Sequence, residues 1–220
     1  MITLIATGHY EKGICNSIEL CNIIERISPD VIFEEVPPDK FSAIYEGLNS
    51  YSLEQRAIKK YLQKKYIDHF PVDMNSDDLN DEFFINDYNF MSNIFRYHSP
   101  EYKVLCYEWK NQPAQYGFPF LNNQECEKLL ERKLFLEGEL VKSINNKILT
   151  DRYFEWRKFN HDRENEMIKN IYSYCNQKES KNALFLVGAE HRLPIIEKIS
   201  KREMENENEL KLKWNFNYFG

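Results

Sequence analysis

The sequence lacks the features that assign many proteins to a class at sight. It has only five cysteines and no C-x-x-C pair, so neither a disulfide framework nor a zinc ribbon is indicated. No apolar run approaches the length of a membrane span. No basic segment followed by a long apolar one opens the chain, because Gly8 and His9 interrupt the first apolar run. These absences predict a reduced protein of the cytoplasm with no membrane partner.

Positive charge is also scarce. The chain has 29 Lys and Arg against 35 Asp and Glu, a formal net charge of −6 at pH 7, so no nucleic-acid partner is expected. The sequence contains no internal repeat, low-complexity tract or clear linker. Its 220 residues, 42% of them hydrophobic and 15% aromatic, are enough to bury a sizeable core. We therefore expect one globular domain over residues 1–220, and the sequence leaves its oligomeric state open.

Two histidines occupy matching places near the two ends of the chain. Residues 2–7 and 183–187 form largely apolar runs that predict short buried strands. Each run is followed by a glycine and, within three further residues, a histidine; these residues are Gly8, His9, Gly188 and His191. In an open parallel sheet, ligands bind in the crevice beyond the carboxyl ends of the strands. Either histidine alone is more often a simple strand cap, but the pair favours one shared site.

The elements between these histidines predict an α/β fold. Apolar residues repeat at helical spacing from Ile14 to Ile27, and Asn16 and Glu19 have the spacing of a capping box. This predicted helix separates the first strand from a second one at residues 30–35. These three elements form a βαβ unit, whose crossover is expected to be right-handed. A further helix is expected over residues 51–66 and a weaker strand over residues 66–73. The pattern favours a mainly parallel sheet flanked by helices.

The second half of the chain has a different character. Three segments are expected to be helical: 81–97, 124–147 and 151–176. Residues of about 80–150 are therefore expected to form a helical insertion. Residues 111–123 carry prolines, a glycine and aromatics and are expected to be a loop, either a lid over a site or a packed connection. The charged run 201–209 predicts a helix end or loop, and the strict alternation over residues 210–218 predicts an antiparallel edge strand.

Carboxylates stand at the predicted strand ends, as the histidines do. They are Glu34, Glu35, Asp73 and Glu190. Glu34 and Glu35 cannot both point the same way on a strand, and Glu35 is preferred because it stands at the very end of its run. Asp73 by itself is more often a turn or cap residue. Histidine and carboxylate together suit Zn²⁺, Mn²⁺, Fe²⁺ or Co²⁺, which lower the pKa of a bound water. Without a metal, a histidine base oriented by a carboxylate activates water directly.

Arg163 is the remaining candidate. It lies four residues before Met167, at the beginning of the apolar stripe of a predicted helix, so its side chain is expected to face inward. A guanidinium on a buried side needs an anionic partner. That partner is either a carboxylate of the site or the oxyanion of a reacting substrate. The alternative is that Arg163 forms an ordinary ion pair with a nearby glutamate on the protein surface.

Taken together, these residues resemble the pattern of one superfamily, the TraB/Tiki group, which includes the erythromycin esterase-like and ChaN-like proteins. The resemblance covers somewhat under half of the chain, and the matching stretches are Ala6–His9, Pro29–Glu35, Pro71–Asp73, Arg163 with Met167, and Val187–His191. Two positions depart from the pattern. Ala6 replaces the first glycine of the leading G-x-x-H, and Met74 stands where TraB relatives usually carry arginine. The membrane segments of many relatives are absent.

The resemblance implies an α/β fold with a site built from both histidines and the strand-end glutamate. The catalytic residues are then His9, Glu35, Arg163 and His191, with His9, Glu35 and His191 as ligands of a divalent metal such as Mn²⁺, Co²⁺ or Zn²⁺. Tiki proteins are proteases and the esterase branch cleaves a lactone. The resemblance therefore implies a metal-assisted hydrolase that cleaves a peptide or ester bond in a peptide or small-molecule substrate. The alternatives are a non-catalytic protein that binds a small molecule or haem, and an interaction protein that keeps the fold without activity. We expect specificity to lie in residues 80–150.

Overall fold

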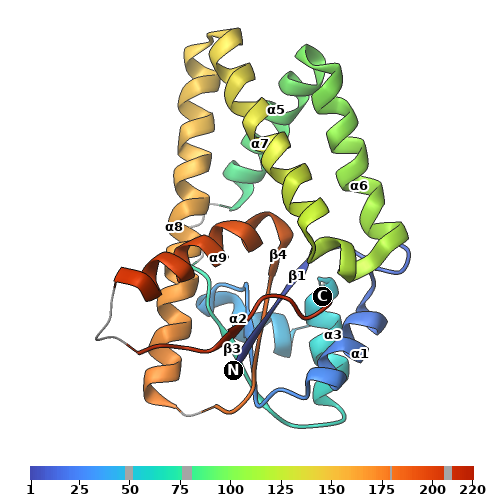
Figure 1. Ribbon diagram of the computed structural model, residues 1–220, viewed down its shortest axis with the longest axis vertical. Coiled ribbons are helices and arrows are strands. Elements are labelled where there is room, and N and C mark those ends of the chain that lie inside the picture. The colour runs from blue at the N-terminus through green and yellow to red at the C-terminus, as the bar shows by residue number, and fades with distance from the viewer. Residues whose placement is uncertain (48–51, 76–80, 179, 206–209) are drawn as a thin grey trace.

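The computed structural model describes residues 1–47, 52–75, 81–178, 180–205 and 210–220. Within these residues, five strands form one sheet in the spatial order β3-β2-β4-β1-β5, and every neighbouring pair is parallel. The strands are β1 (Ile2–Thr7), β2 (Val31–Glu34), β3 (Asp68–Pro71), β4 (Ala183–Gly188) and β5 (Trp214–Asn215). Strands β1 and β4, which are about 180 residues apart in the sequence, pair near the middle of the sheet (Figure 1). The predicted α/β fold with a mainly parallel sheet is confirmed.

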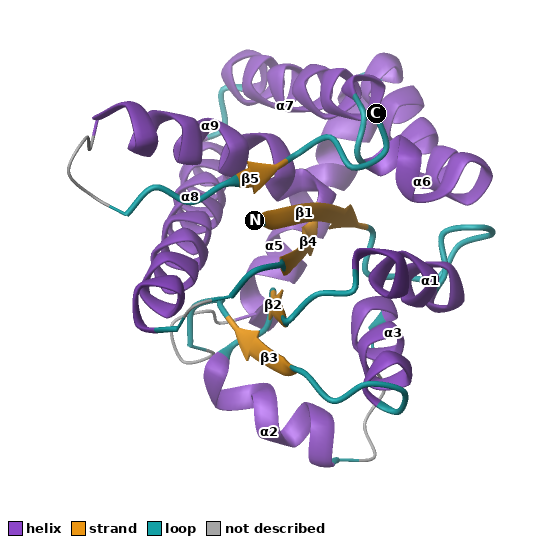
Figure 2. Ribbon diagram, turned by 60° about the horizontal axis from the view of Figure 1, so that its bottom comes forward, coloured by secondary structure: helices purple, strands orange, loops and turns teal. Residues whose placement is uncertain are grey.

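Helices cover both faces of this sheet (Figure 2). They are α1 (Ser17–Ile27) and α3 (Leu53–Leu62) on one face, and α8 (Lys147–Gln177) and α9 (Ala189–Glu205) on the other. Successive residues of β4 alternate between the two cores: Leu184 packs with α1 and α3, and Phe185 packs with α8 and α9. Because both faces are buried, the strands read as continuous apolar runs rather than as an apolar and polar alternation. The short helix α2 (Pro38–Glu46) lies beside β3 at one edge of the sheet (Figure 2).

A group of long helices stands at the end of the sheet toward which the strands run (Figure 1). It consists of α5 (Asp81–His98), α6 (Pro100–Leu121), α7 (Gln124–Ile144) and the first part of α8. The helices predicted over residues 81–97, 124–147 and 151–176 correspond to α5, α7 and α8. This group has a small core of its own, made of Met91, Phe95, Tyr102, Val141, Leu149 and Tyr153. Among the described helices, none is both long and apolar enough to cross a bilayer.

Residues 111–123, expected to form a loop, are mostly helical. Helix α6 continues through them and is broken once, at Gly117, whose φ of 66° lies in the left-handed region that favours glycine. Pro119 stands in the first turn after this break, where its missing N–H has no helical hydrogen bond to lose. Phe118 and Leu121 are buried. The segment is therefore a packed connection, the second of the two forms left open by the sequence.

Asn122 ties the end of α6 to the central strand. Its Oδ1 accepts a hydrogen bond of 2.7 Å from the N–H of Ala6, and its Nδ2 donates one of 3.0 Å to the carbonyl of Ala6. Strand β5 pairs only with Ile2 and Thr3. The amide of Asn122 therefore takes the place of a neighbouring strand along the last part of β1, just before His9. This contact fixes the helical group relative to the edge of the sheet that carries the site.

The C-terminal strand lies at the sheet edge as expected, but its predicted antiparallel direction is wrong. Helix α9 carries the chain from the carboxyl end of β4 back to the opposite end of the sheet, so β5 starts where β1 starts and runs parallel to it. Only Trp214 and Asn215 of the predicted 210–218 strand pair with β1. Residues 201–205 continue α9. The rest of that charged run, 206–209, and the first residue of the helix predicted over 51–66 lie outside the described residues.

Candidate active site

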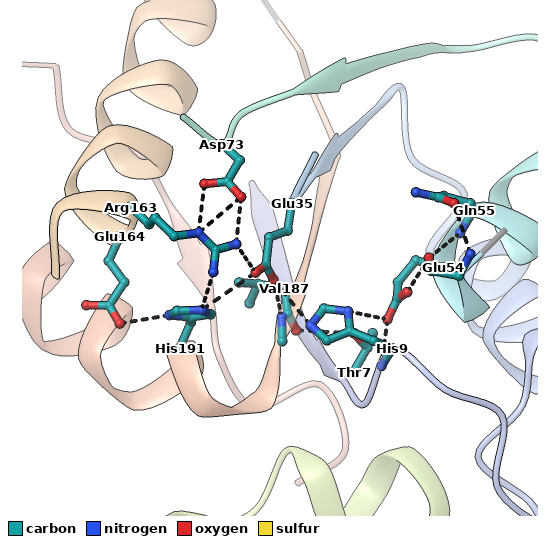
Figure 3. A network of polar contacts seen from close by, with 12 residues as sticks. Thr7, His9, Glu35, Glu54, Gln55, Asp73, Arg163, Glu164, Val187 and His191 are labelled. Carbon is teal, nitrogen blue, oxygen red and sulfur yellow. Dashed lines mark hydrogen bonds and ion pairs between the residues drawn. The ribbon is translucent and has the colours of Figure 1, made fainter. Parts of the chain in front are cut away.

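Neighbouring strands bring the predicted site residues to one edge of the sheet. β2, β4 and β1 are adjacent, and Glu35, Gly188 and His9 stand at or within two residues of their carboxyl ends. His191 follows in the first turn of α9, and Asp73 follows β3 by two residues. Figure 3 shows the labelled side chains at this edge, directed toward one another from distant parts of the chain. The structure thus brings together both histidines and the glutamate, as the sequence predicted.

Glu35 lies between the two histidines. Its Oε2 is 3.8 Å from Nε2 of His9, and its Oε1 is 3.6 Å from Nε2 of His191. The N–H of Gly188 donates to Oε2 at 2.6 Å, and Nη2 of Arg163 donates to Oε1 at 2.6 Å. Burial raises the pKa of Glu35, but the positive charges of Arg163 and the histidines outweigh it and lower this pKa to about 2. Glu35 is therefore ionised across the whole physiological range.

Arg163 reaches from α8 into this edge. Its Nη2 donates to Oδ2 of Asp73 at 2.6 Å, and its Nε lies 3.2 Å from both carboxylate oxygens of the same residue. The guanidinium is mostly buried and also bonds Glu35. Burial lowers the pKa of Arg163, but the charges of Glu35 and Asp73 raise it above its ordinary value. The inward orientation expected from the helix stripe is present, and the anionic partners are carboxylates of the site.

His9 is held in an uncommon backbone conformation, with φ at 59°. Its N–H donates to Oε1 of Glu54 at 3.2 Å, and its Nδ1 lies 3.3 Å from the same oxygen. Ser52 donates to the other oxygen of Glu54 at 2.7 Å. Burial lowers the pKa of His9, but the carboxylates of Glu35 and Glu54 outweigh it and raise this pKa from 6.5 to about 9. His9 is therefore an imidazolium at neutral pH, with 44% of its side chain still exposed.

His191 has a different set of partners. Nη1 of Arg163 lies 3.3 Å from Nε2 of His191, and Oε1 of Glu164 lies 2.9 Å from Nδ1. A guanidinium only donates hydrogen bonds, so Nε2 is the acceptor and Nδ1 carries the proton that is donated to Glu164. Lys198 contacts the second oxygen of Glu164 at 2.9 Å. Glu164 thus fixes the Nδ1–H tautomer of the imidazole, and the lone pair of Nε2 is directed toward Arg163 in the site.

Sequence reasoning missed the two carboxylates that orient the histidines. Glu54 lies within the capping box that Ser52 and Gln55 form at the start of α3. The sequence therefore indicated only the beginning of a helix at this point. Glu164 lies three residues before Met167 on the apolar stripe of α8, and it is buried. The same spacing argument that singled out Arg163 also applied to Glu164.

The remaining predicted residues have unequal roles. Glu34 is turned to other partners: its carboxylate contacts Nδ1 of His69 at 2.6 Å and accepts from the hydroxyl of Tyr45. Burial raises the pKa of Glu34. Gly8 serves no visible steric need, because a Cβ there meets only a side-chain carbon at 3.9 Å. A Cβ on Gly188, by contrast, lies 2.5 Å from Nε2 of His9, so a larger residue there requires the His9 ring to move.

A cavity of about 900 Å³ opens over these residues. His9, Glu35, Arg163 and His191 line its floor, while Tyr88, Trp109, Trp156 and Phe159 line it from the long helices. Its size is within the range of small-molecule sites. The helical group outside the family resemblance therefore contributes an aromatic wall to the site. Tyr88 and Trp109 belong to residues 80–150, whose role in specificity stays a prediction, whereas Trp156 and Phe159 lie outside that range.

The predicted metal ligands meet, but their donor atoms are already engaged. Both oxygens of Glu35 accept hydrogen bonds, and Nε2 of His191 accepts from Arg163. The guanidinium thus provides the positive charge that a divalent metal provides in a histidine and carboxylate site. In the described part of the chain, no group of three His, Cys, Asp or Glu is placed to hold a metal ion. The residues as arranged do not fit a metal, and metal dependence stays a prediction for chelation to test.

The comparisons with known proteins add no further constraint. No protein-family model, curated protein or solved structure matches this chain. The resemblance to the TraB/Tiki superfamily therefore stays a prediction, and the functional argument depends on the geometry of the site.

Proposed function

We propose that the protein is a hydrolase of ester or amide bonds that works by acid–base catalysis with two histidines. The observation that carries this proposal is the pair of imidazoles on the two sides of one buried carboxylate, Glu35, on the floor of a large cavity. His9 is a cation at neutral pH, and His191 presents a lone pair. A site that holds one acid and one base at close range is suited to hydrolysis.

His191 acts as the general base in this proposal. A water molecule takes the place of Nη1 of Arg163, which lies 3.3 Å from Nε2 of His191. Nε2 then takes a proton from this water while the water oxygen attacks the carbonyl carbon of the substrate. Glu164, itself bound to Lys198, holds the Nδ1–H of His191 and stabilises the imidazolium that forms. The base is therefore fixed in tautomer and in orientation before the substrate binds.

His9 acts as the general acid. The tetrahedral intermediate collapses when the bond between the carbonyl carbon and the leaving oxygen or nitrogen breaks, and His9 donates a proton to that leaving atom. The products are a carboxylic acid and an alcohol or amine. Solvent then returns the proton from His191 to His9, which restores the starting state. The exposed part of the His9 ring faces the cavity, where the leaving group lies.

Arg163 and Asp73 keep Glu35 in place between the histidines. Two carboxylates and one guanidinium form a buried ion cluster that fixes the distance from Glu35 to each imidazole. Arg163 also lines the cavity, but Glu35 and Asp73 balance its charge, so its role in the reaction is to position Glu35. Each of the four residues that the sequence singled out as catalytic thus has a place in the proposal.

The test is hydrolysis of a panel of 4-nitrophenyl esters and short peptides by the purified protein, with and without EDTA. We expect turnover, and we expect EDTA to leave its rate unchanged. His191→Ala and His9→Ala are each expected to reduce kcat/KM by at least a hundredfold. Loss of activity with EDTA and recovery with added Mn²⁺, Co²⁺ or Zn²⁺ contradicts the metal-free reaction and supports the metal-assisted one. No turnover of any substrate, together with a haem absorption band or a retained small molecule, supports a binding protein instead.

We also propose a reducing compartment, the cytoplasm, as the location of the protein. All five cysteines are free thiols in the structure, and three of them are buried. Buried unpaired thiols are typical of proteins that are kept reduced. The purified protein is unfolded and alkylated, once with and once without prior treatment with a reductant. Both samples are expected to have the same mass, with five alkylated cysteines. A disulfide in protein isolated under alkylating conditions contradicts this location.

A further inference from the structure

Glu190 lies where two cavities meet. The cavity over the site has a neighbour of about 490 Å³ between α7, α8 and α9. Trp156, Asn160, Glu190 and His191 line both of them. Glu190 directly precedes His191 in the first turn of α9, yet the acid–base reaction described above does not use it. Its position beside the reacting groups makes it a candidate for substrate recognition.

The partner of Glu190 is a buried lysine. Nζ of Lys133 lies 3.3 Å from a carboxylate oxygen of Glu190 and 3.3 Å from one of Glu137. The side chains of Lys133 and Glu137 are 6% and 1% exposed, whereas that of Glu190 is 39% exposed. Of this group, only Glu190 lines the cavity over the site, whereas Lys133, Glu137 and Glu190 all line the smaller cavity. With one cation between two carboxylates, the group carries an excess negative charge.

A second excess of negative charge faces the same cavity. Arg163 is likewise one cation between two carboxylates, Glu35 and Asp73. The other charged pairs of the site balance each other, since His9 faces Glu54 and Lys198 faces Glu164. Two more basic residues line the cavity and are turned to partners of their own: Arg56 to Glu11, and Lys12 to the carbonyl of Lys110. Glu11 balances the charge of Arg56, whereas the carbonyl that Lys12 contacts carries no charge, so these groups together leave one negative charge in excess.

Two aromatic rings, those of Tyr88 and Trp156, line the same cavity as Glu190. Tyr88 and Trp156 are stacked, with ring centroids 4.9 Å apart, and Nζ of Lys133 lies 5.1 Å from the Tyr88 centroid. A carboxylate beside aromatic faces in an electronegative cavity is the general chemistry that binds ammonium groups. Neutral or anionic substrates gain nothing from this combination. We propose that Glu190 and Trp156 form a subsite for an ammonium group, and that the substrate is an ester or amide that carries a cationic amine.

The proposal rests on the hydrolase function, and it fixes where the cation lies relative to the reaction. Glu190 is adjacent in sequence to His191, the proposed base, and its negative charge acts on both His191 and His9. The ammonium therefore binds a few bonds away from the carbonyl that is attacked. Glu190 is a specificity-determining residue in this account, and it takes no part in proton transfer.

The kinetic test uses two 4-nitrophenyl esters of the same shape. One is the ester of 4-(trimethylammonio)butanoic acid, and the other is the ester of 5,5-dimethylhexanoic acid, its neutral isostere. We expect the wild-type protein to favour the cationic ester by about tenfold in kcat/KM, as a charged contact of this kind supports. Glu190→Gln is expected to bring the ratio of the two kcat/KM values close to one, whereas Glu190→Asp retains a preference. Glu166→Gln, on an exposed face of α8 beside Lys169, removes the same charge and keeps the wild-type ratio.

A binding measurement separates this proposal from the hydrolase function. Choline and 3,3-dimethylbutan-1-ol are titrated into the wild-type and Glu190→Gln proteins, with Trp156 and Trp109 fluorescence as the signal. Tighter binding of choline to the wild type only, even in a protein without turnover, supports the subsite while the hydrolase function fails. Equal affinity for the two compounds, or equal kcat/KM for the two esters in the wild type, overturns the subsite whether or not Glu190→Gln folds. A preference that Glu190→Gln retains in full overturns the role of Glu190.

Discussion

The backbone N–H of Gly188 donates a hydrogen bond of 2.6 Å to Oε2 of Glu35, although 153 residues separate them in the chain. This bond joins the ends of β4 and β2 and holds the carboxylate that both histidines contact. The absence of a side chain at Gly188 also leaves room for Nε2 of His9. One glycine therefore sets the spacing of the whole site, and it gives the sharpest test of that spacing.

Gly188→Ala is expected to reduce activity at least a hundredfold. The new Cβ lies 2.5 Å from Nε2 of His9 and 3.3 Å from Oε2 of Glu35, so both side chains must move from their present contacts. A displacement of about 1 Å at a catalytic group can cost about a hundredfold in rate. Steady-state kinetics with the best ester of the panel provides the measurement.

Gly138→Ala is the matched control for this substitution. Gly138 lies within α7, where a Cβ meets only the Tyr153 hydroxyl oxygen at 3.8 Å. Alanine in a helix interior is more favourable than glycine by about 0.5–1 kcal/mol, so the control protein is expected to be slightly more stable and fully active. Full activity of Gly188→Ala contradicts the close packing of His9 against β4.

Arg163→Ala is expected to lower the free energy of unfolding by about 3–5 kcal/mol and to abolish activity. The substitution leaves Glu35 and Asp73 buried without their cation, which is the costly way to break a buried ion pair. Arg163→Lys keeps one charge but not the planar fork, so a smaller loss of stability and at least a tenfold loss of activity are expected. Urea unfolding and kcat/KM measure the two effects.

The control for the arginine variants is Arg132→Lys. Arg132 forms an exposed pair with Glu101, and exposed pairs contribute about 0–1 kcal/mol. Its stability and activity are expected to stay at wild-type levels. An Arg163→Ala protein with the stability of this control contradicts the buried ion cluster.

Glu164→Gln is expected to lower kcat by about a hundredfold with little change in KM, because a neutral amide neither fixes the tautomer of His191 nor stabilises its cation. Glu164 is a positioning residue, so the test needs a signal that a purely structural role does not change. The ¹⁵N shifts of the His191 ring report its tautomer, which is expected to change from a single Nδ1–H form to a mixture. Glu166→Gln, on the same helix, is the control, and an unchanged His191 tautomer in Glu164→Gln is the contrary outcome.

The pH dependence should report His9. Its pKa is raised to about 9, so the proposed acid is protonated at neutral pH and kcat is expected to fall as pH rises through about 9. Because the folded pKa lies above the unfolded value of 6.5, His9 also stabilises the fold fully below pH 6.5, and this contribution is lost as pH rises through about 9. Glu54→Gln removes one of the two carboxylates that raise the pKa, so the fall in kcat moves to lower pH.

The ¹H shift of the His9 ring measures the same titration directly, without turnover. In Glu54→Gln the midpoint is expected to move down, while Glu139→Gln, which removes an exposed carboxylate on α7, leaves it in place. A His9 midpoint near 6.5 in the wild type contradicts both its charge at neutral pH and its role as the acid.

The sequence by itself determined the frame of the site. The short, mainly apolar runs at residues 2–7, 31–33 and 183–187 favour strands buried on both faces, and such strands run parallel in α/β folds. The carboxyl ends of parallel strands lie at the same edge of the sheet. The residues that follow these strands therefore lie close together, whatever structure the chain between the strands adopts. Periodicity is a local property, and for that reason the sequence also placed α5, α7 and α8 and turned Arg163 inward.

Only the tertiary structure decided the partners. Arg163 contacts Glu35 and Asp73, and the two histidines contact Glu54 and Glu164. These contacts depend on how α3 and α8 pack against the sheet, and no local pattern in the sequence encodes that packing. The same reason explains the two errors. The helix through residues 111–121 and the parallel direction of β5 depend on contacts across the fold, with β1 in both cases, which override the local signals of proline and alternation.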